Sequence, residues 1–427
     1  MPSTDPAAAP DPRAVFLRRE SEVRGYCRSF PAVFRAAKGA RLIADDGREW
    51  IDFLAGAGSL NYGHNPPEVV AEVVAYLQRD GIGHSLDLHT TAKRDFLLAF
   101  EDCVLKPRNL DYRVQFTNPT GTNAVEAALK LARKATGRSG IIAFTNGYHG
   151  MTLGALAATG NKYNRAAAGV PLSGTTFMPY DGWLGPGIDS VAVLEKYLDD
   201  PSSGVDLPAA VIVETVQGEG GINIASTAWL KRLEAAARAR GVLLIIDDIQ
   251  VGCGRTGTFF SFESAGLTPD IVVLSKSIGG CGLPFAVLLN RPDLDARWKP
   301  AEHNGTFRGN NLAFVAAAAA LRHWWTGRAF ESEIAAKGDT VRARLNAIVA
   351  ANPGKKLTVR GRGLMNGLVC ADPDLAARIS AKCYQDGLII ERAGPHDEVV
   401  KCMPPLTIDA ADLNRGLDIL TAAVAAV

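Results

Sequence analysis

The chain has 427 residues, of which 47% are hydrophobic and 21% are charged, a balance typical of a folded protein with two or three domains. Lysine and arginine total 46 against 45 acidic residues, so the net charge of +1 gives no polybasic surface for nucleic acid or an anionic membrane. The expected partners are therefore small molecules.

The N-terminus and the cysteines predict a cytoplasmic protein. Residues 1–13 carry acidic residues and prolines but no apolar core, which predicts a flexible tail and argues against a signal peptide. The seven cysteines are scattered and never spaced as C-x-x-C, so they indicate neither a disulfide framework nor a zinc site.

Residues 14–75 mix short strands and turns. From about residue 112, β-branched runs alternate with helical patterns at 123–135 and 229–241. This βαβ series predicts an α/β fold with a doubly wound, mostly parallel sheet. The predicted strands are YRVQFT from Tyr112, GIIAFT from Gly140, AAVIVETV from Ala209, VLLIID from Val242, DIVVLS from Asp270 and PFAVLLN from Pro284.

The last third of the chain has a different pattern. Residues 312–321 are ten apolar residues, about half of the roughly 20 that cross a bilayer, and predict a buried helix. From about residue 326 a long helix precedes the strand-like segments LTVRG and VVKCM. We therefore predict a large cofactor-binding domain at 76–325 and a smaller α+β domain that joins 14–75 with 326–427.

Lys276 closes the β-branched run IVVLS and opens a Gly-rich turn, 29 residues after Asp247 ends another run. This pattern suits pyridoxal 5'-phosphate: the amine bonds the aldehyde, and the carboxylate keeps the pyridine nitrogen protonated. Most lysines are merely surface charges, but one inside an apolar segment is costly to bury unless it is neutralised. Both residues lie at carboxyl ends of predicted strands, where α/β sheets bind ligands.

Four further residues could complete such a site. Gly121 and Thr122 follow a strand and open a helix, which predicts a phosphate cup, although a plain helix cap has the same pattern. Tyr148, with His149 beside it, could lay an aromatic face on a planar ring, or simply pack in the core. Gln250 could donate a hydrogen bond to a ring oxygen, or be a surface amide.

Other cofactors are not favoured. Residues 252–257 fit the dinucleotide pattern G-x-G-x-x-G, but they do not directly follow a strand and no helical pattern follows them. No metal site is indicated, and no H-E-x-x-H, Walker or G-x-S-x-G pattern occurs.

Five segments together resemble the class III aminotransferases, which are fold type I pyridoxal-phosphate enzymes: GTNAVEAALKLAR, VETVQGEGG, LLIIDDIQVGCGRTG, LSKSIGGCGLP and NGTFRGNNLA. The resemblance covers about residues 20–425. It implies that Lys276 bonds the cofactor, that Asp247 pairs with the ring nitrogen and that Gln250 contacts the ring oxygen. It further implies that Tyr148 stacks on the ring and that Gly121 and Thr122 hold the phosphate.

The resemblance also concerns three residues farther from the lysine. Thr306 matches a threonine that reaches the phosphate from the neighbouring subunit, which implies a homodimer or higher oligomer with a shared active site. Glu219 matches a gating glutamate. Lys401 stands where many relatives have the arginine that pairs with this glutamate or binds a substrate carboxylate, and a lysine offers a point charge in place of a bidentate fork. The carboxylate could instead be bound by Arg255, Arg360 or Arg362.

Within the family, segments such as SEVRGYCRSFPAVF and VVKCMPPLTI resemble the diaminobutyrate-forming enzymes of the ectoine pathway. This implies a ping-pong reaction in which L-glutamate becomes 2-oxoglutarate and L-aspartate 4-semialdehyde becomes L-2,4-diaminobutyrate. The alternatives are an ω-aminotransferase for ornithine, 4-aminobutyrate or a diamine, an aminomutase, and a non-catalytic pyridoxal-phosphate-binding protein.

Overall fold

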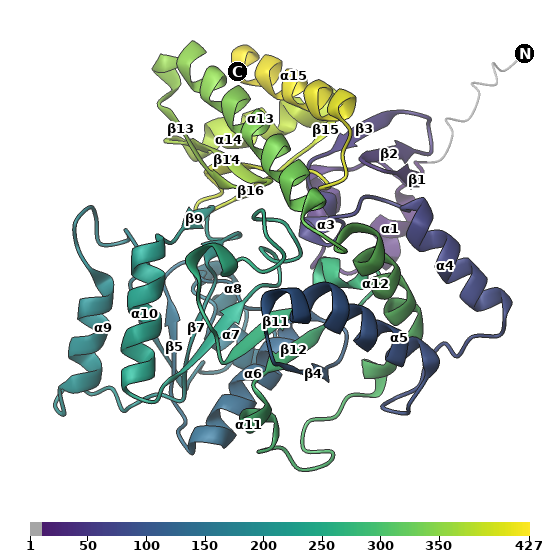
Figure 1. Ribbon diagram of the computed structural model, residues 1–427. Coiled ribbons are helices and arrows are strands. Elements are labelled where there is room, and N and C mark those ends of the chain that lie inside the picture. The colour runs from purple at the N-terminus through teal and green to yellow at the C-terminus, as the bar shows by residue number, and fades with distance from the viewer. Residues whose placement is uncertain (1–10) are drawn as a thin grey trace, which may run out of the picture.

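The computed structural model describes residues 11–427 and has a larger part below a smaller one (Figure 1). Most of the predicted tail, residues 1–10, lies outside the described residues. The smaller part contains the N-terminal strands and the C-terminal elements, which lie together although they are far apart in the sequence. The predicted domain boundaries stay a prediction.

The larger part is built on a seven-stranded sheet in the order β4-β12-β11-β10-β7-β5-β6. Strands β6, β5, β7, β10 and β11 run parallel, whereas β12 is antiparallel to both β11 and β4. The sheet confirms the predicted α/β class. The strands are β4 (Arg113–Phe116), β5 (Ile141–Phe144), β6 (Thr175–Met178), β7 (Ala210–Val213), β10 (Leu243–Asp247), β11 (Ile271–Leu274) and β12 (Val287–Asn290).

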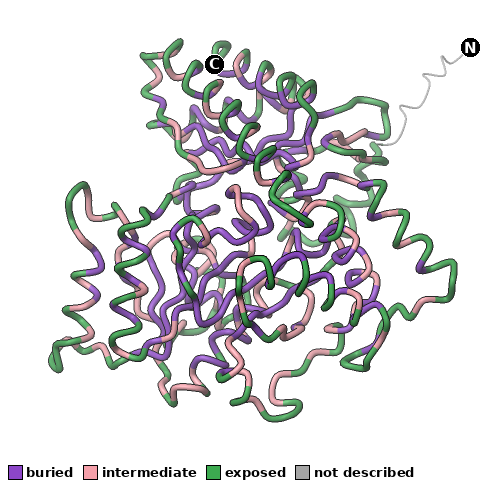
Figure 2. The backbone as a smooth tube through the Cα atoms, in the orientation of Figure 1, coloured by how far each residue is buried: buried purple, intermediate pink, exposed green. Residues whose placement is uncertain are grey.

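Both faces of this sheet are buried, which explains the continuous apolar runs in its strands. In β11, Val272 and Leu274 belong to one core cluster, and Ile271 and Val273 belong to another on the opposite face. Helix α6 packs against β11 and β12, and α10 packs against β10. Figure 2 shows the buried backbone running through the centre of this part, with exposed helices outside it.

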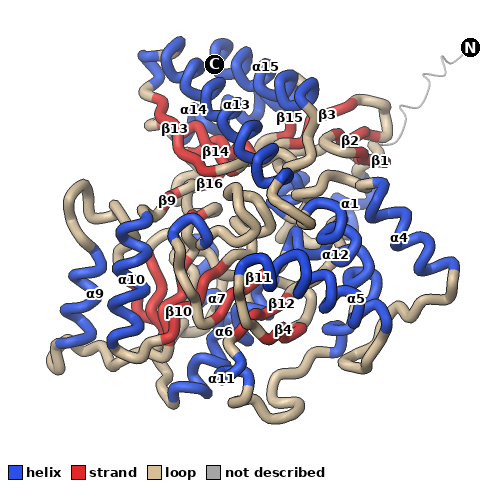
Figure 3. The backbone as a smooth tube through the Cα atoms, viewed as in Figure 1, coloured by secondary structure: helices blue, strands red, loops and turns tan. Residues whose placement is uncertain are grey.

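The smaller part holds two sheets (Figure 3). One has the order β13-β14-β17-β16 and the other β1-β2-β3-β15. Strand β15, late in the chain, pairs in parallel with β3, so the two ends of the chain share a sheet. The strands are β1 (Phe34–Lys38), β2 (Arg41–Ala44), β3 (Glu49–Asp52), β13 (Leu357–Arg362), β14 (Met365–Cys370), β15 (Leu388–Ile389), β16 (Glu391–Ala393) and β17 (Val399–Cys402).

The helices agree with the main periodic patterns. The Ala-rich stretch lies inside α12, which packs against α4 and α5. Within the described residues, no helix has the length and apolar character that crossing a membrane requires. The main helices are α4 (Pro67–Gln78), α5 (Thr91–Phe100), α6 (Gly121–Thr136), α9 (Ser190–Asp199), α10 (Thr227–Ala239), α12 (Asn311–Trp324), α13 (Ala329–Ala351), α14 (Pro373–Gln385) and α15 (Ala410–Ala426).

Candidate active site

A cavity of about 240 Å³ lies at the carboxyl ends of β5, β7, β10 and β11. Most of the predicted site residues line it, although they come from widely separated segments. The cavity is lined by Gly121, Thr122, Tyr148, His149, Gly150, Met151, Glu214, Glu219, Asp247, Ile249, Gln250 and Lys276. The parallel strands bring these loops together because their carboxyl ends meet at one edge of the sheet.

Lys276 opens a short 3₁₀ helix, η4 (Lys276–Gly279), directly after β11. Its backbone has φ 53°, a left-handed conformation that costs a residue other than glycine about 1–3 kcal/mol and is typical of functional sites. Burial lowers the pKa of Lys276 despite the opposing effect of Glu219, and the positive Lys401 lowers it further. A lower pKa increases the share of neutral amine, the form that can bond an aldehyde.

Asp247 is the last residue of β10 and is buried. Its Oδ2 lies 2.7 Å from Nδ1 of His149, and its Oδ1 accepts the backbone N–H of Ile249 at 3.1 Å. Burial opposes a charge on His149, but the hydrogen bond and the charge of Asp247 outweigh it and raise the pKa of the imidazole. His149 thus orients the carboxylate, a contact that the sequence did not reveal because the two residues are 98 positions apart.

The start of α6 provides an anion-binding end to the cavity. The Thr120 hydroxyl accepts the N–H of Asn123 at 3.4 Å and so caps the helix. The amides of Gly121 and Thr122, in the first turn, have no acceptor within the helix, and the first turn holds no acidic residue. A Cβ on Gly121 would lie 2.8 Å from the terminal methyl of Ile249, so a larger residue would require the Ile249 side chain to shift.

Gln250 connects the cavity with Glu219. Its Nε2 donates to Glu219 Oε1 at 2.8 Å and to the carbonyl of Ala57 at 2.9 Å. Its Oε1 is buried and has no hydrogen-bond partner among the described residues. A buried polar atom without a partner suits a site that a polar molecule fills.

Lys401, on β17, is fully buried and ion-paired with Glu219 at 2.8 Å. A second carboxylate, Glu391 on β16, also lies 2.8 Å from the same ammonium. Burial disfavours the charge on Lys401, but the two carboxylates outweigh it and raise its pKa. Burial likewise opposes ionisation of Glu219, yet Lys401 and Lys276 lower its pKa to about 2. Glu219 is therefore ionised at neutral pH.

Glu219 lies between the inner cavity and a wider one. A cavity of about 770 Å³ shares Glu219 and Tyr148 with the cavity of Lys276. The Glu219 side chain is 30% exposed, whereas that of Lys401 is 0% exposed. The carboxylate is thus at the passage by which a small molecule would reach Lys276.

Two of the arginines considered for carboxylate binding are engaged elsewhere. Buried Arg255 donates to backbone carbonyls and to the Asn61 side chain, and burial lowers its pKa to about 9. Arg362 donates to the hydroxyl of Thr215 and to the carbonyl of Ser261. Neither lines the cavity of Lys276.

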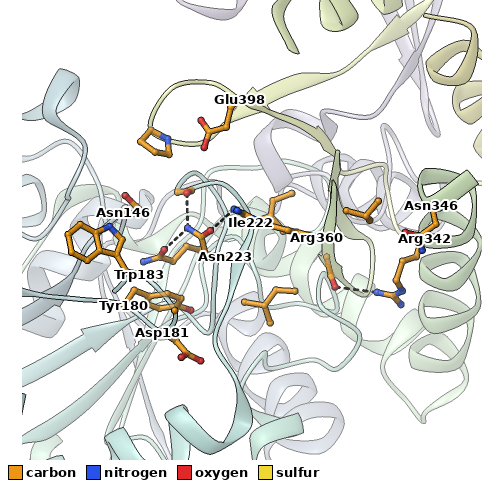
Figure 4. A pocket seen from close by; sticks show the side chains of 17 residues that line it. Asn146, Tyr180, Asp181, Trp183, Ile222, Asn223, Arg342, Asn346, Arg360 and Glu398 are labelled. Atoms are coloured by element: carbon orange, nitrogen blue, oxygen red, sulfur yellow. Dashed lines mark hydrogen bonds between the residues drawn. The ribbon is translucent and has the colours of Figure 1, made fainter. Parts of the chain in front are cut away.

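The third arginine, Arg360, lies in a separate cavity of about 680 Å³ (Figure 4). Its guanidinium donates to Asn223 Oδ1 at 2.7 Å and to the carbonyl of Gly221 at 3.1 Å. Figure 4 shows the side chain directed toward Asn223. Lys401, which is paired with Glu219, is therefore the remaining candidate for binding a substrate carboxylate.

Thr306 does not line the cavity of Lys276. It is exposed at the start of the 3₁₀ helix η5 (Thr306–Gly309), where its carbonyl lies 2.6 Å from Nε2 of His84. Its contact with a neighbouring subunit stays a prediction. Among residues 11–427, no cluster of histidine, cysteine, aspartate and glutamate could hold a metal ion.

Glu214 also lines the cavity, although the sequence did not single it out. Its carboxyl allows the effect of burial on ionisation to be tested. Burial raises the pKa of its carboxyl from 4.5 to about 7, although its oxygens accept the backbone N–H groups of Tyr148 and Gly218. A carboxyl whose pKa is raised on folding stabilises the protein below its unfolded pKa, and this stability is lost as pH rises through the folded value.

Glu214→Gln is therefore expected to raise the free energy of unfolding by about 1–3 kcal/mol near pH 8, with no gain near pH 4. Denaturant unfolding across this pH range measures the difference. The exposed Glu333 on α13 gives the control variant Glu333→Gln. A gain of equal size at both pH values would contradict the assignment.

The class III aminotransferase family model matches residues 25–424. The chain belongs to this family. The match spans both parts of the molecule, from the N-terminal segment to the last helix. It confirms the expected enzyme class and its cofactor, pyridoxal 5'-phosphate.

Curated relatives are similar over nearly the whole chain. A protein of Sinorhizobium fredii, named an uncharacterized aminotransferase, is 58% identical and covers 96% of this chain and 92% of its own. A protein of Halomonas elongata, named diaminobutyrate–2-oxoglutarate transaminase, is 57% identical and covers 95% of this chain and 97% of its own.

Among solved structures, the ornithine aminotransferase of Toxoplasma gondii has a TM-score of 0.84 and 28% sequence identity. The alignment covers 97% of this chain and 94% of the other, and that structure contains partially occupied PLP at its active site. The fold of this chain is thus the fold type I of pyridoxal-phosphate enzymes, as expected.

Proposed function

We propose that this aminotransferase moves the amino group of L-glutamate to the terminal aldehyde of L-aspartate 4-semialdehyde. The products are 2-oxoglutarate and L-2,4-diaminobutyrate. The observation that carries the proposal is the 57% identity to a named diaminobutyrate–2-oxoglutarate transaminase over 95% of the chain. The ion pair of Glu219 with Lys401, in place of the arginine common in relatives, agrees with it.

The residues of the cavity suit pyridoxal 5'-phosphate. The free amides at the start of α6, Gly121 and Thr122, would hold the phosphate, and the ring of Tyr148, which lines the cavity, would stack on the cofactor. Gln250 also lines the cavity, and its amide would contact the ring oxygen of the bound cofactor. We further propose that Thr306 of a second subunit completes the phosphate site in a homodimer or a higher homo-oligomer.

When bound, the cofactor supplies an aldehyde that bonds amino groups and a ring that withdraws electrons from the substrate carbon. Lys276 holds the cofactor between turnovers and moves the proton of the reacting carbon in both halves of the reaction. Asp247, oriented by His149, provides the negative charge that keeps the ring nitrogen protonated. One lysine is thus tether, base and acid in turn.

Glu219 and Lys401 distinguish the two substrates. Glutamate reacts at a carbon that carries a carboxylate, and we propose that Lys401 binds this group after Glu219 moves aside. The semialdehyde reacts at its aldehyde carbon, which carries a hydrogen where glutamate carries the carboxylate. No substrate carboxylate then reaches Lys401, so Glu219 neutralises it. Because Glu219 is partly exposed and Lys401 is fully buried, the carboxylate is the group that can move.

The reaction is tested by mixing the holoenzyme with glutamate and one aldehyde, then identifying the amine by mass spectrometry. We expect L-2,4-diaminobutyrate and an equal amount of 2-oxoglutarate from aspartate 4-semialdehyde, at a rate at least about 10-fold above the rates with glutamate 5-semialdehyde and succinate semialdehyde.

A preference for one of the other aldehydes would replace this proposal with an ornithine or 4-aminobutyrate aminotransferase, which the structural similarity to the Toxoplasma gondii enzyme makes the second candidate. Isomerisation of the aldehyde, with its own amino group moved to the aldehyde carbon and no 2-oxoglutarate released, would indicate an aminomutase. The seven free cysteines agree with the proposed reducing, cytoplasmic location.

A further inference from the structure

The ammonium of Lys401 lies between two carboxylates, and only one of them faces the substrate cavities. Glu219 and Glu391 each place an Oε1 atom 2.8 Å from Nζ of Lys401. Glu219 lines both the inner and the outer cavity, whereas Glu391 lines neither. The two counter-ions therefore differ in their access to substrate.

The backbone holds Glu391 in place. Strands β16 and β17 are antiparallel, and Glu391 is the direct cross-strand partner of Lys401, so both side chains project from the same face. The Tyr26 hydroxyl donates to Glu391 Oε2 at 3.3 Å. The Glu391 side chain is 6% exposed against 30% for Glu219.

We infer that Glu391 is a positioning residue that remains on Lys401 as a permanent counter-ion while Glu219 exchanges with the carboxylate of glutamate. The inference rests on the proposed function, because it assumes that Lys401 binds a substrate carboxylate. It concerns a residue that does not touch substrate and acts only through the lysine.

The physical need for a second carboxylate follows from the burial of Lys401. If Glu219 were its one counter-ion, the departure of Glu219 would leave an unpaired ammonium in the protein interior, which favours loss of the proton. A neutral lysine would then bind a carboxylate poorly. With Glu391 present, the ammonium stays charged and fixed throughout the exchange.

Of the groups near Lys401, the two carboxylates favour its charged form, whereas the positive Lys276 opposes it. These groups are Glu219, Glu391, the ammonium of Lys276 and the Tyr26 hydroxyl on the far side of Glu391. Burial raises the pKa of Glu391 in spite of Lys401, and repulsion from Glu219 raises it further. When Glu219 moves aside this repulsion falls, so Glu391 becomes the stronger counter-ion.

The test is the binding of glutarate, a dicarboxylate that lacks the reacting amino group, to the holoenzyme of Glu391→Gln. Removal of one adjacent carboxylate lowers the pKa of an ammonium by about 1–3 units. We therefore expect calorimetry to show that, between about pH 7 and about pH 10.5, the Kd rises at least about 3-fold more in the variant than in wild type.

Glu398→Gln is the matched control, because Glu398 lies on the segment joining β16 and β17 and accepts the N–H of His396. It should bind glutarate as wild type does. The same pH dependence in Glu391→Gln as in wild type would overturn the inference, and so would a wild-type enzyme that does not bind glutarate.

A second readout separates positioning from simple structural support. At alkaline pH, Glu391→Gln should slow the half-reaction with glutamate about 10-fold more than the half-reaction with the semialdehyde. Equal losses in both would assign Glu391 a structural role only. If glutarate binding behaves as expected but no diaminobutyrate is formed, the proposed substrate is wrong while the role of Glu391 stands.

Discussion

Lys276→Ala is expected to lower the rate of amino transfer about 10⁴-fold or more, because in the proposed mechanism this one side chain holds the cofactor and moves the proton in both half-reactions. Its backbone in a left-handed conformation at the end of β11 and its position on the cavity wall agree with this role. The loss should appear in kcat with each substrate and with each direction of transfer. The variant should remain folded, because alanine removes an amine whose burial costs free energy.

The effect is measured by steady-state rates and by the chemical state of the cofactor. Borohydride reduction should attach the cofactor permanently to the wild-type peptide that contains Lys276, and mass spectrometry should find no such attachment in the variant. Lys134→Ala is the control, since Lys134 forms only a partly exposed ion pair with Glu302 on the outside of α6. A Lys276→Ala enzyme with normal steady-state rates would end the assignment.

Lys401→Met is expected to lower the free energy of unfolding by about 3–5 kcal/mol, because removal of one partner leaves buried charge without compensation. Here it leaves the carboxylates of Glu219 and Glu391 facing each other, each formerly 2.8 Å from the lost ammonium. The variant should also raise KM for glutamate and 2-oxoglutarate, because both have a carboxylate on the reacting carbon.

The pH dependence of this loss has a definite sign. With the ammonium gone, mutual repulsion and burial raise the folded pKa of both carboxyls above the unfolded values. The penalty is then present only at pH values where the carboxyls are ionised, and it should shrink as pH falls toward about 4. Denaturant unfolding at several pH values measures this trend.

Lys337→Met supplies the matched control for Lys401→Met. Lys337 is half-buried, and its ammonium donates to the carbonyl of Leu406 at 2.7 Å without an ion pair among the described residues. Its replacement should cost less and show no recovery at low pH. A loss in Lys401→Met that is the same at every pH would mean that packing, and not charge, explains it.

The sequence by itself was sufficient for the fold class, and most of the residues that it predicts for the site line one cavity. The apolar runs of β10 and β11 have the lengths and flanks typical of buried parallel strands. Asp247 is the last residue of β10, and Lys276 lies two residues after β11 ends. The short strand β6 was not predicted, because three of its four residues are only partly buried and the strand carries little apolar pattern.

The tertiary structure alone decided the electrostatics around this core. His149 reaches Asp247 across 98 positions of sequence, and Glu391 meets Lys401 through a strand register that no local pattern specifies. Arg255, Arg360 and Arg362 were equal candidates in the sequence, yet each is engaged by backbone or side-chain oxygens outside the cavity.

The physical reason for this division is the range of the interactions. Hydrophobic periodicity and helix caps act between neighbours in the chain, so the sequence records them directly. The partner of a charged group depends on distances between segments that the fold brings together. The sequence therefore determined that Lys276 and Asp247 lie at the ends of two apolar strands, and only the fold determined that Lys401 lies between two carboxylates that differ in exposure.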